Sequence, residues 1–145
     1  MFELNSILLV DDDEASHFIN KIFIKKLDLK VKVYEVLNGM EALDFLDKVS
    51  TSVKMINAFA PCLLVLDIYM PIMDGWQFLD AYLERYPKAI RDKIIIIMMT
   101  LSEDDRDIIK AKNNTVIKEY IPKPLTDEKL VEIMEKYFTM NDIPE

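Results

Sequence analysis

The chain has 145 residues, 51% of them hydrophobic and 30% charged, which is typical of one ordinary soluble domain. The formal net charge of −8 argues against a nucleic-acid surface, because a duplex binder needs a basic patch. The single cysteine, Cys62, excludes an internal disulfide and fits a reducing cytoplasm. The sequence contains neither a signal peptide nor a membrane-spanning run, so we expect one cytoplasmic domain over residues 1–145 without membrane attachment.

The first predicted strand, residues 7–10, is followed directly by four acidic residues, 11–14. Four adjacent carboxylates repel one another, and a divalent cation such as Mg²⁺ would relieve that repulsion. Asp13 is the expected N-cap of the next helix, and Glu14 suits its first turn. A capped, solvated turn without a metal explains the same cluster, so both interpretations stay open at this point.

The next predicted helix is marked by apolar residues at helical spacing, namely Ala15, Phe18, Ile19, Ile22, Phe23 and Leu27. His17, the only histidine, lies off this stripe and is expected to be exposed. It has no second histidine to pair with, so no zinc site is expected.

The stretch 31–36 has mixed polarity, which favours an edge strand. Asn38 is expected to cap the helix that follows, with Glu41 three residues on completing a capping pair. We assign neither structure nor function to the connection 50–60.

The run 62–66 is apolar without a break and predicts a strand that is buried on both faces. Asp67 follows at once, where the strand leaves the sheet. Ligands of open parallel sheets bind beyond the carboxyl ends of the strands, so Asp67 stands at the mouth of such a site. An aspartate that only caps a loop is the other interpretation of the same position.

The second half continues the alternation of strands and helices. A helix that ends near Tyr86 follows the turn at Asp74-Gly75 and carries apolar residues on one face, namely Trp76, Leu79, Leu83 and Tyr86. The most apolar run, 94–99, predicts a central strand that ends in Thr100. Ser102 is expected to begin the next helix, which runs to about Ala111.

The last predicted strand, 116–121, leads into Lys123 between two prolines, and Thr126 is expected to cap the final helix. Five β-α alternations predict a parallel α/β sheet with helices on both faces. We choose the flavodoxin-like, doubly wound order 2-1-3-4-5, which leaves the mixed second strand at an edge.

In that sheet, four strands end on the same side, and their ends carry Asp11 and Asp12, Asp67, Thr100, and Lys123. Carboxylates with a divalent ion, a hydroxyl and a lysine are the components of a phosphoryl-transfer site. Asp67 is the expected nucleophile, forming an aspartyl phosphate. The metal and Lys123 would neutralise the phosphoryl oxygens, and Thr100 would donate a hydrogen bond to one of them.

With these motifs, and with Met70-Pro71, Asp74-Gly75 and Lys123-Pro124, the chain resembles the receiver domains of two-component response regulators from about residue 7 to 138. The chain is similar in kind to stand-alone, chemotaxis-type regulators. The resemblance implies that a sensor histidine kinase or a histidine phosphotransfer protein phosphorylates Asp67. The downstream protein target is not identified by the sequence.

The resemblance also implies roles for individual residues. It implies Mg²⁺ held by Asp12, Asp67 and the backbone carbonyl of Tyr69, with Asp11 acting through water. It further implies a Thr100–Tyr120 switch, a cis Lys123–Pro124 bond, and an output face made of the helix after Ser102, the last strand and the last helix. Tyr69 and Ser102 occupy the two positions that tune dephosphorylation.

The chain departs from the family pattern at several places. Leu101 replaces the usual small residue after Thr100 and narrows the expected access to the pocket, and the segment 50–60 is longer than usual. Only residues 139–145 follow Phe138, so we expect no output domain and a protein that acts through its own surface. In this interpretation the chain is not an enzyme but a phosphoacceptor that assists its own phosphorylation and dephosphorylation.

Alternatives remain within and outside the family. A phosphorelay intermediate, or a degenerate receiver that binds proteins without being phosphorylated, has the same fold. A phosphohydrolase of the haloacid-dehalogenase type needs a second acid two residues after its nucleophile, and Tyr69 stands there. A flavodoxin-type flavin carrier needs a Ser/Thr/Gly-rich loop after the first strand, where this chain has acids.

Overall fold

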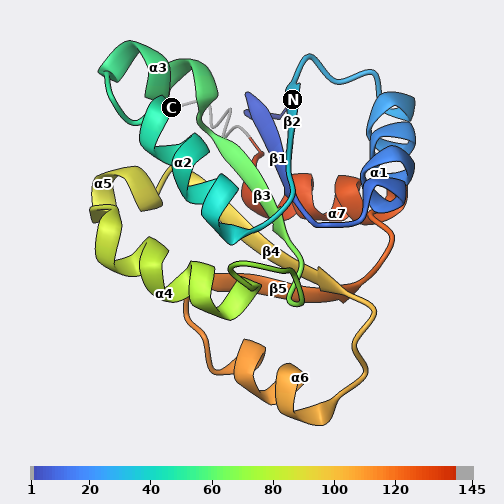
Figure 1. Ribbon diagram of the computed structural model, residues 1–145. Coiled ribbons are helices and arrows are strands. Elements are labelled where there is room, and N and C mark those ends of the chain that lie inside the picture. The colour runs from blue at the N-terminus through green and yellow to red at the C-terminus, as the bar shows by residue number, and fades with distance from the viewer. Residues whose placement is uncertain (1, 140–145) are drawn as a thin grey trace.

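Five parallel strands form one sheet in the order β2-β1-β3-β4-β5, which confirms the predicted flavodoxin-like topology (Figure 1). The computed structural model describes residues 2–139, so residue 1 and residues 140–145 of the expected domain lie outside the described residues. The strands are β1 (Ser6–Val10), β2 (Lys32–Val36), β3 (Cys62–Leu66), β4 (Ile94–Thr100) and β5 (Ile117–Pro122). The helices are α1 (Glu14–Lys26), α2 (Gly39–Val49), α3 (Val53–Phe59), α4 (Gly75–Arg85), α5 (Lys88–Arg91), α6 (Asp105–Lys112) and α7 (Asp127–Tyr137).

The sheet separates two hydrophobic clusters, with α1 and α7 covering one face and α2, α3 and α4 the other (Figure 1). Alternate residues of a strand enter opposite clusters: Ile7 and Leu9 of β1 face α7, whereas Leu8 and Val10 face α2. A strand covered on both faces has no solvent side, which is why the sequence shows continuous apolar runs there. The edge strand β2 is partly exposed, as its mixed polarity predicts.

The helix caps follow the sequence signals at most positions. Asp13, Asn38 and Thr126 each accept a backbone N–H in the first turn of α1, α2 and α7, as predicted. The Glu41 carboxylate accepts the N–H of Leu37 instead of that of Asn38, so the expected capping pair closes one residue further upstream. The connection to which the sequence assigned no structure contains α3, capped by Ser52.

The exposed position predicted for His17 is wrong, because its side chain is 1% exposed. His17 Nε2 lies 2.7 Å from the backbone oxygen of Asp11, and Asn20 Oδ1 accepts the N–H of Leu125 at 3.0 Å. Buried backbone groups at the end of the sheet need such partners, so α1 turns polar side chains inward. Four residues of its apolar stripe, Ala15, Phe18, Ile19 and Ile22, are consequently exposed.

Two further details of the helices differ from the sequence prediction. Asp104, not Ser102, is the N-cap of α6, and its side chain accepts the N–H of Arg106. On α4 the buried aromatic residues are Phe78 and Tyr82, whereas Leu83 is exposed.

Within residues 2–139, no helix has both the length and the hydropathy needed to cross a membrane.

Candidate functional site

Strand register brings the two central carboxylates together. Val10 of β1 pairs with Leu66 of β3, so Asp11 and Asp67 are the next residues on adjacent strands. The N–H of Asp67 donates to the oxygen of Val10 at 3.0 Å, and the N–H of Asp11 donates to the oxygen of Val36 at 3.1 Å. These bonds continue the ladder of the sheet by one residue, so the backbone positions both side chains.

Lys123 directly follows β5, and its side chain reaches both the Asp11 and the Asp67 carboxylates. Its Nζ lies 2.6 Å from Asp11 Oδ2 and 3.3 Å from Asp67 Oδ2, and its side chain is 13% exposed. The backbone N–H of Lys123 donates to the oxygen of Thr100 at 3.2 Å, which attaches this turn to β4. The Lys123–Pro124 bond is cis, as the resemblance implied, and Ala60–Pro61 is a second cis bond that we had not predicted.

The surroundings shift the pKa values of Asp67 and Lys123. Burial, followed by the negative charge of Asp11, raises the pKa of Asp67 to about 6, although Lys123 opposes the shift. Burial alone would lower the pKa of Lys123. The hydrogen bond to Asp11 and the charges of Asp67 and Asp11 outweigh burial, so the pKa of the ammonium group is raised. The two acids therefore share one firmly protonated lysine.

The carboxylates of Asp11, Asp12 and Asp67 fit a small, hard cation. Each offers one oxygen, and the three oxygens lie within 4.8 Å of one another. The N–H of Asp13 donates to Asp11 Oδ1 and the N–H of Ile68 donates to Asp67 Oδ1, both at 2.9 Å, so two of the groups are held in orientation. Mg²⁺ prefers such a set of a few carboxylate oxygens completed by carbonyl oxygens and water.

Gly75 lets the loop after β3 pack against the back of Asp67. A Cβ at this position would lie 2.4 Å from the backbone oxygen of Asp67, which no side chain tolerates. The N–H of Gly75 donates to the oxygen of Ile68 at 2.7 Å and closes the loop. The glycine that the sequence marked only as a turn is therefore needed for close backbone approach.

The remaining predicted residues gather beside this pocket. Thr100 is buried, and its hydroxyl accepts the N–H of Ser102 at 3.0 Å. The hydroxyl of Tyr120 donates to the backbone oxygen of Ser102 at 3.2 Å. Tyr69 is 58% exposed, and its hydroxyl donates to Asp107 on α6 at 2.5 Å. Leu101 is exposed at the rim, between Lys123 and the start of α1.

Asp107 is the site residue that the sequence prediction missed. It is 7% exposed and joins Tyr69 to Ser102. In the sequence it is one of several acids near the start of a helix, where acids are common because they favour the helix dipole. No signal in the sequence separates it from its exposed neighbour Asp105.

Residues 7–135 match the family described as the response regulator receiver domain. The chain is 29% identical to the "Probable C4-dicarboxylate response regulator DctR" of Halalkalibacterium halodurans over 92% of this chain and 51% of that protein. It is 28% identical to the "Chemotaxis protein CheY" of Listeria monocytogenes over 90% of this chain and 95% of that protein. The chain therefore spans about half the length of the first of these curated relatives and nearly the whole of the second.

Solved structures agree with the sequence match. A two component response regulator from Cytophaga hutchinsonii superimposes with a TM-score of 0.79 at 26% identity, over 93% of this chain and 97% of that one.

Proposed function

The chain belongs to the response regulator receiver domain family, and we propose that it is a phosphoacceptor that receives a phosphoryl group on Asp67. The observation that carries this proposal is the Asp67 carboxylate at a strand end, 3.3 Å from Lys123 and beside Asp11. In the reaction, an oxygen of Asp67 forms a bond to phosphorus. The bond from phosphorus to the donor nitrogen or oxygen breaks, and its electron pair leaves with the donor.

The surrounding residues have distinct roles in this proposal. Lys123 neutralises charge on the phosphoryl oxygens, and Thr100 donates a hydrogen bond to one of them. Asp12, Asp67 and the backbone carbonyl of Tyr69, with Asp11 acting through water, would hold Mg²⁺, which would supply further positive charge. The raised pKa of Asp67, about 6, leaves its carboxylate mostly ionised and nucleophilic at neutral pH.

The donor in this proposal is a sensor histidine kinase or a histidine phosphotransfer protein, and the phosphoryl group is transferred to this chain in the cytoplasm. The likeness to a chemotaxis protein, 95% of which is covered by the match, supports a receiver that signals through its own surface. A phosphorelay intermediate has the same chemistry at Asp67 and differs only in passing the phosphoryl group on.

The test is incubation with Mg²⁺ and acetyl phosphate, followed by intact-mass measurement. The wild type is expected to gain one base-labile phosphoryl group, and Asp67→Asn is expected to gain none. Asp80→Asn, an exposed aspartate of α4, is the matched control and should behave as the wild type. A phosphoryl group on Asp67→Asn would refute the assignment.

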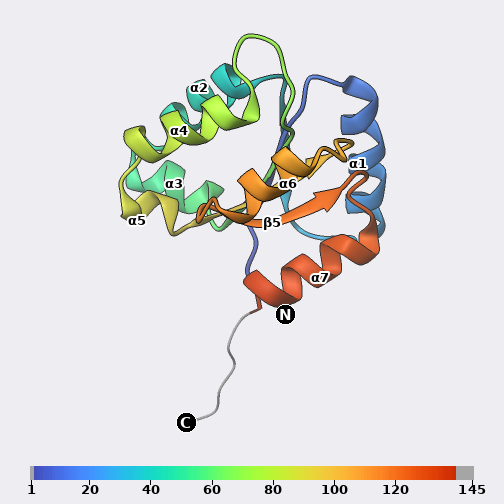
Figure 2. The ribbon, with the colours of Figure 1, turned by 90° about the horizontal axis from the view of Figure 1, so that it is seen from below.

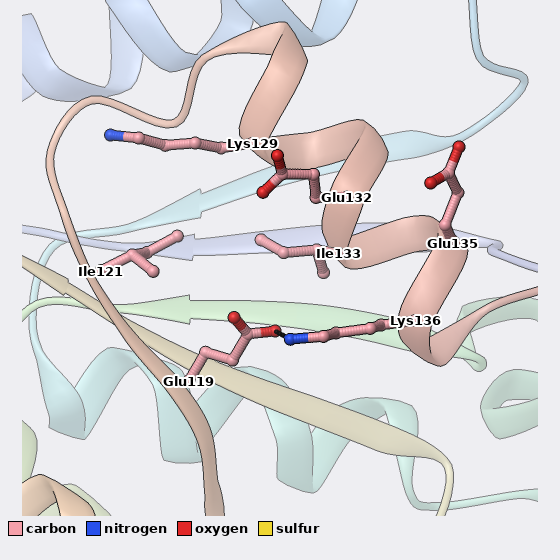
Figure 3. A pocket seen from close by; sticks show the side chains of 7 residues that line it. All are labelled: Glu119, Ile121, Lys129, Glu132, Ile133, Glu135 and Lys136. Atoms are coloured by element: carbon pink, nitrogen blue, oxygen red, sulfur yellow. Dashed lines mark hydrogen bonds and ion pairs between the residues drawn. The ribbon is translucent and has the colours of Figure 1, made fainter.

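We propose α6, β5 and α7 as the output face, with Tyr120 responding to Thr100. Figure 2 shows β5 in front, between these two helices. Between β5 and α7 lies an open cavity of about 340 Å³ with Ile121 and Ile133 at its apolar floor (Figure 3). Its rim is charged and consists of Glu119, Lys129, Glu132, Glu135 and Lys136.

Beryllofluoride, a phosphoryl mimic, should shift the NMR signals of residues around Tyr120. Identical spectra with and without the mimic would contradict the proposed Thr100–Tyr120 switch.

Tyr69 and Ser102 also carry a proposed role in the lifetime of the phosphorylated state. In this proposal the bulk of Tyr69, two residues after Asp67, restricts the approach of water, and Ser102 has no charge to orient that water. Tyr69→Asn should therefore shorten the lifetime of the phosphorylated mass after donor removal. Tyr69→Phe keeps the ring and should decay no faster than the wild type. Equal decay rates for Tyr69→Asn and the wild type would show that the side chain does not restrict water.

A further inference from the structure

Ser102 is the centre of a hydrogen-bond network next to the charged pocket. Its N–H donates to Thr100 Oγ1 at 3.0 Å, and its backbone oxygen accepts the hydroxyl of Tyr120 at 3.2 Å. Its own hydroxyl donates to Asp107 Oδ2 at 2.8 Å and accepts the N–H of Asp104 at 3.2 Å. Both members of the proposed switch are thus attached to this one residue.

Asp107 connects this centre to the loop that carries the phosphoacceptor. The same oxygen, Oδ2, accepts the hydroxyl of Ser102 and, at 2.5 Å, the hydroxyl of Tyr69, which lies two residues after Asp67. A buried carboxylate needs such donors, and hydrogen bonds to an ionised group are about twice as strong as neutral ones. One carboxylate therefore joins the loop after β3 to the loop after β4.

A second contact joins α6 to α4, the helix that follows the loop after β3. The ammonium group of Lys110 lies over the ring of Trp76, 4.6 Å from its centre. Asp107 and Lys110 are three residues apart, so they share one face of α6. Both contact aromatic side chains of the segment after β3, so α6 and that segment are held together at two points.

The network determines what the hydroxyl of Thr100 can do. A threonine hydroxyl has one proton and two lone pairs. The N–H of Ser102 takes up one lone pair, which leaves the proton free to be donated elsewhere. The position of Ser102 therefore limits where that proton can point, and a donor oriented in advance stabilises developing charge better than a mobile one.

We propose that Asp107, supported by Tyr69, is a positioning residue for phosphoryl transfer: it fixes Ser102 and thereby aims the hydroxyl of Thr100 at the phosphoryl group. This inference rests on the proposed function of Asp67. Asp107 touches neither Asp67 nor Lys123 by hydrogen bond or ion pair among the described residues, so it acts through Ser102 and Thr100.

The first measurement is the rate of phosphoryl gain from acetyl phosphate with saturating Mg²⁺. Asp107→Asn keeps the shape but loses the charge, and its maximal rate should fall about three- to tenfold, in line with weakening of a charge-assisted bond. The donor concentration at half-maximal rate should not change. Tyr69→Phe removes one donor to the carboxylate and should lower the rate about twofold. Asp105→Asn, an exposed acid in the same first turn, should keep the wild-type rate.

A double-mutant cycle separates positioning from a general loss of structure. In a Thr100→Val background the hydroxyl is absent, so Asp107→Asn should have no further effect on the rate. If Asp107→Asn lowers the rate of phosphoryl gain by the same factor in both backgrounds, the inference is overturned. If Asp107→Asn does not fold, the cycle is run with Tyr69→Phe.

An exchange measurement distinguishes failure of the inference from failure of the proposed function. Amide hydrogen exchange at Ser102 should be faster in Asp107→Asn than in the wild type, whether or not the chain is phosphorylated. A wild type that gains no Asp67-dependent phosphoryl group would refute the proposed function and this role together. A wild type that is phosphorylated, with Asp107→Asn equally fast, would refute only this role.

Discussion

Two polar clusters lie side by side at the carboxyl end of the sheet, and they are held in place differently. Asp11, Asp67 and Lys123 are fixed by strand register and by backbone hydrogen bonds that continue the ladder. Ser102 and Asp107 come from a loop and a helix, and their own side-chain bonds hold them. Damage to the charged pocket should therefore change stability and abolish function, whereas damage to the loop network should mainly change rates.

The largest effect on stability is expected for Lys123→Met in metal-free protein at neutral pH. It leaves two nearly buried carboxylates, Asp11 and Asp67, without their cation. Removing one partner of a buried ion pair costs roughly 3 kcal/mol or more of unfolding free energy. Urea denaturation measures this loss, and Lys93→Met, at an exposed lysine, should change stability by less than about 0.5 kcal/mol. Equal midpoints for both variants would show that Lys123 does not neutralise the pocket.

Asp67→Asn is expected to raise the free energy of unfolding of the metal-free protein at neutral pH, whereas Lys123→Met lowers it. The pKa of Asp67 is raised from 3.8 to about 6, so the folded chain binds this proton more tightly than the unfolded chain. The contribution of Asp67 to stability is therefore present below pH 4 and is lost as the pH rises through 6. A shift of about two units corresponds to roughly 3 kcal/mol, which the remaining solvent access reduces to about 2 kcal/mol.

Denaturation of the wild type and Asp67→Asn in EDTA, at pH values from 3.5 to 7.5, checks this expectation. The advantage of the variant should be near zero at the acid end and reach about 2 kcal/mol at the neutral end. Asp80→Asn should show no such pH-dependent gain. A constant difference between wild type and Asp67→Asn across the range would contradict the shifted pKa.

The difference between the clusters also explains what the sequence could predict. Asp11, Asp67 and Thr100 lie at the ends of apolar strands that are buried on both faces, and Lys123 follows the edge strand β5. The parallel strand order therefore brings all four residues to one edge of the sheet. Asp107 depends on the path of a loop and on a partner, Tyr69, that lies far from it in sequence. Sequence periodicity carries no information on such a bond.

The inward face of α1 could not be predicted for a related reason. Apolar spacing favours Phe18, Ile19 and Ile22 as core residues, yet they are exposed, while His17 and Asn20 are buried. The two polar side chains satisfy backbone groups of Asp11 and Leu125, and this demand arises only once the sheet is assembled. On the final helix the core residues are apolar instead: Leu130, Ile133 and Met134 are buried.

Mg²⁺ should stabilise the charged pocket by a moderate amount. A ligand that binds only the folded chain adds about 1.4 kcal/mol to the unfolding free energy at ten times its dissociation constant. The melting temperature should therefore rise with Mg²⁺ concentration, and Asp12→Asn, which removes one candidate ligand, should weaken the rise. Asp44→Asn, on α2 and outside the pocket, is the control. A melting temperature that millimolar Mg²⁺ leaves unchanged would contradict the metal site.

The smallest effect is expected where the loop network meets α4. Lys110 lies over the ring of Trp76, and an exposed cation–π contact is worth about 0.5 kcal/mol. Lys110→Met keeps an apolar side chain of similar length and removes the charge, so stability should fall by about that amount.

Trp76 is the only tryptophan, so its fluorescence reports the loss of the lysine directly. The emission should change in Lys110→Met but not in Lys112→Met, an exposed lysine two residues further along α6. Because α6 is attached through both Lys110 and Asp107, losing the weaker contact alone should leave the rate of phosphoryl gain within about twofold of the wild type. A larger loss of rate in Lys110→Met would place the main attachment of α6 at Trp76 and not at the carboxylate of Asp107.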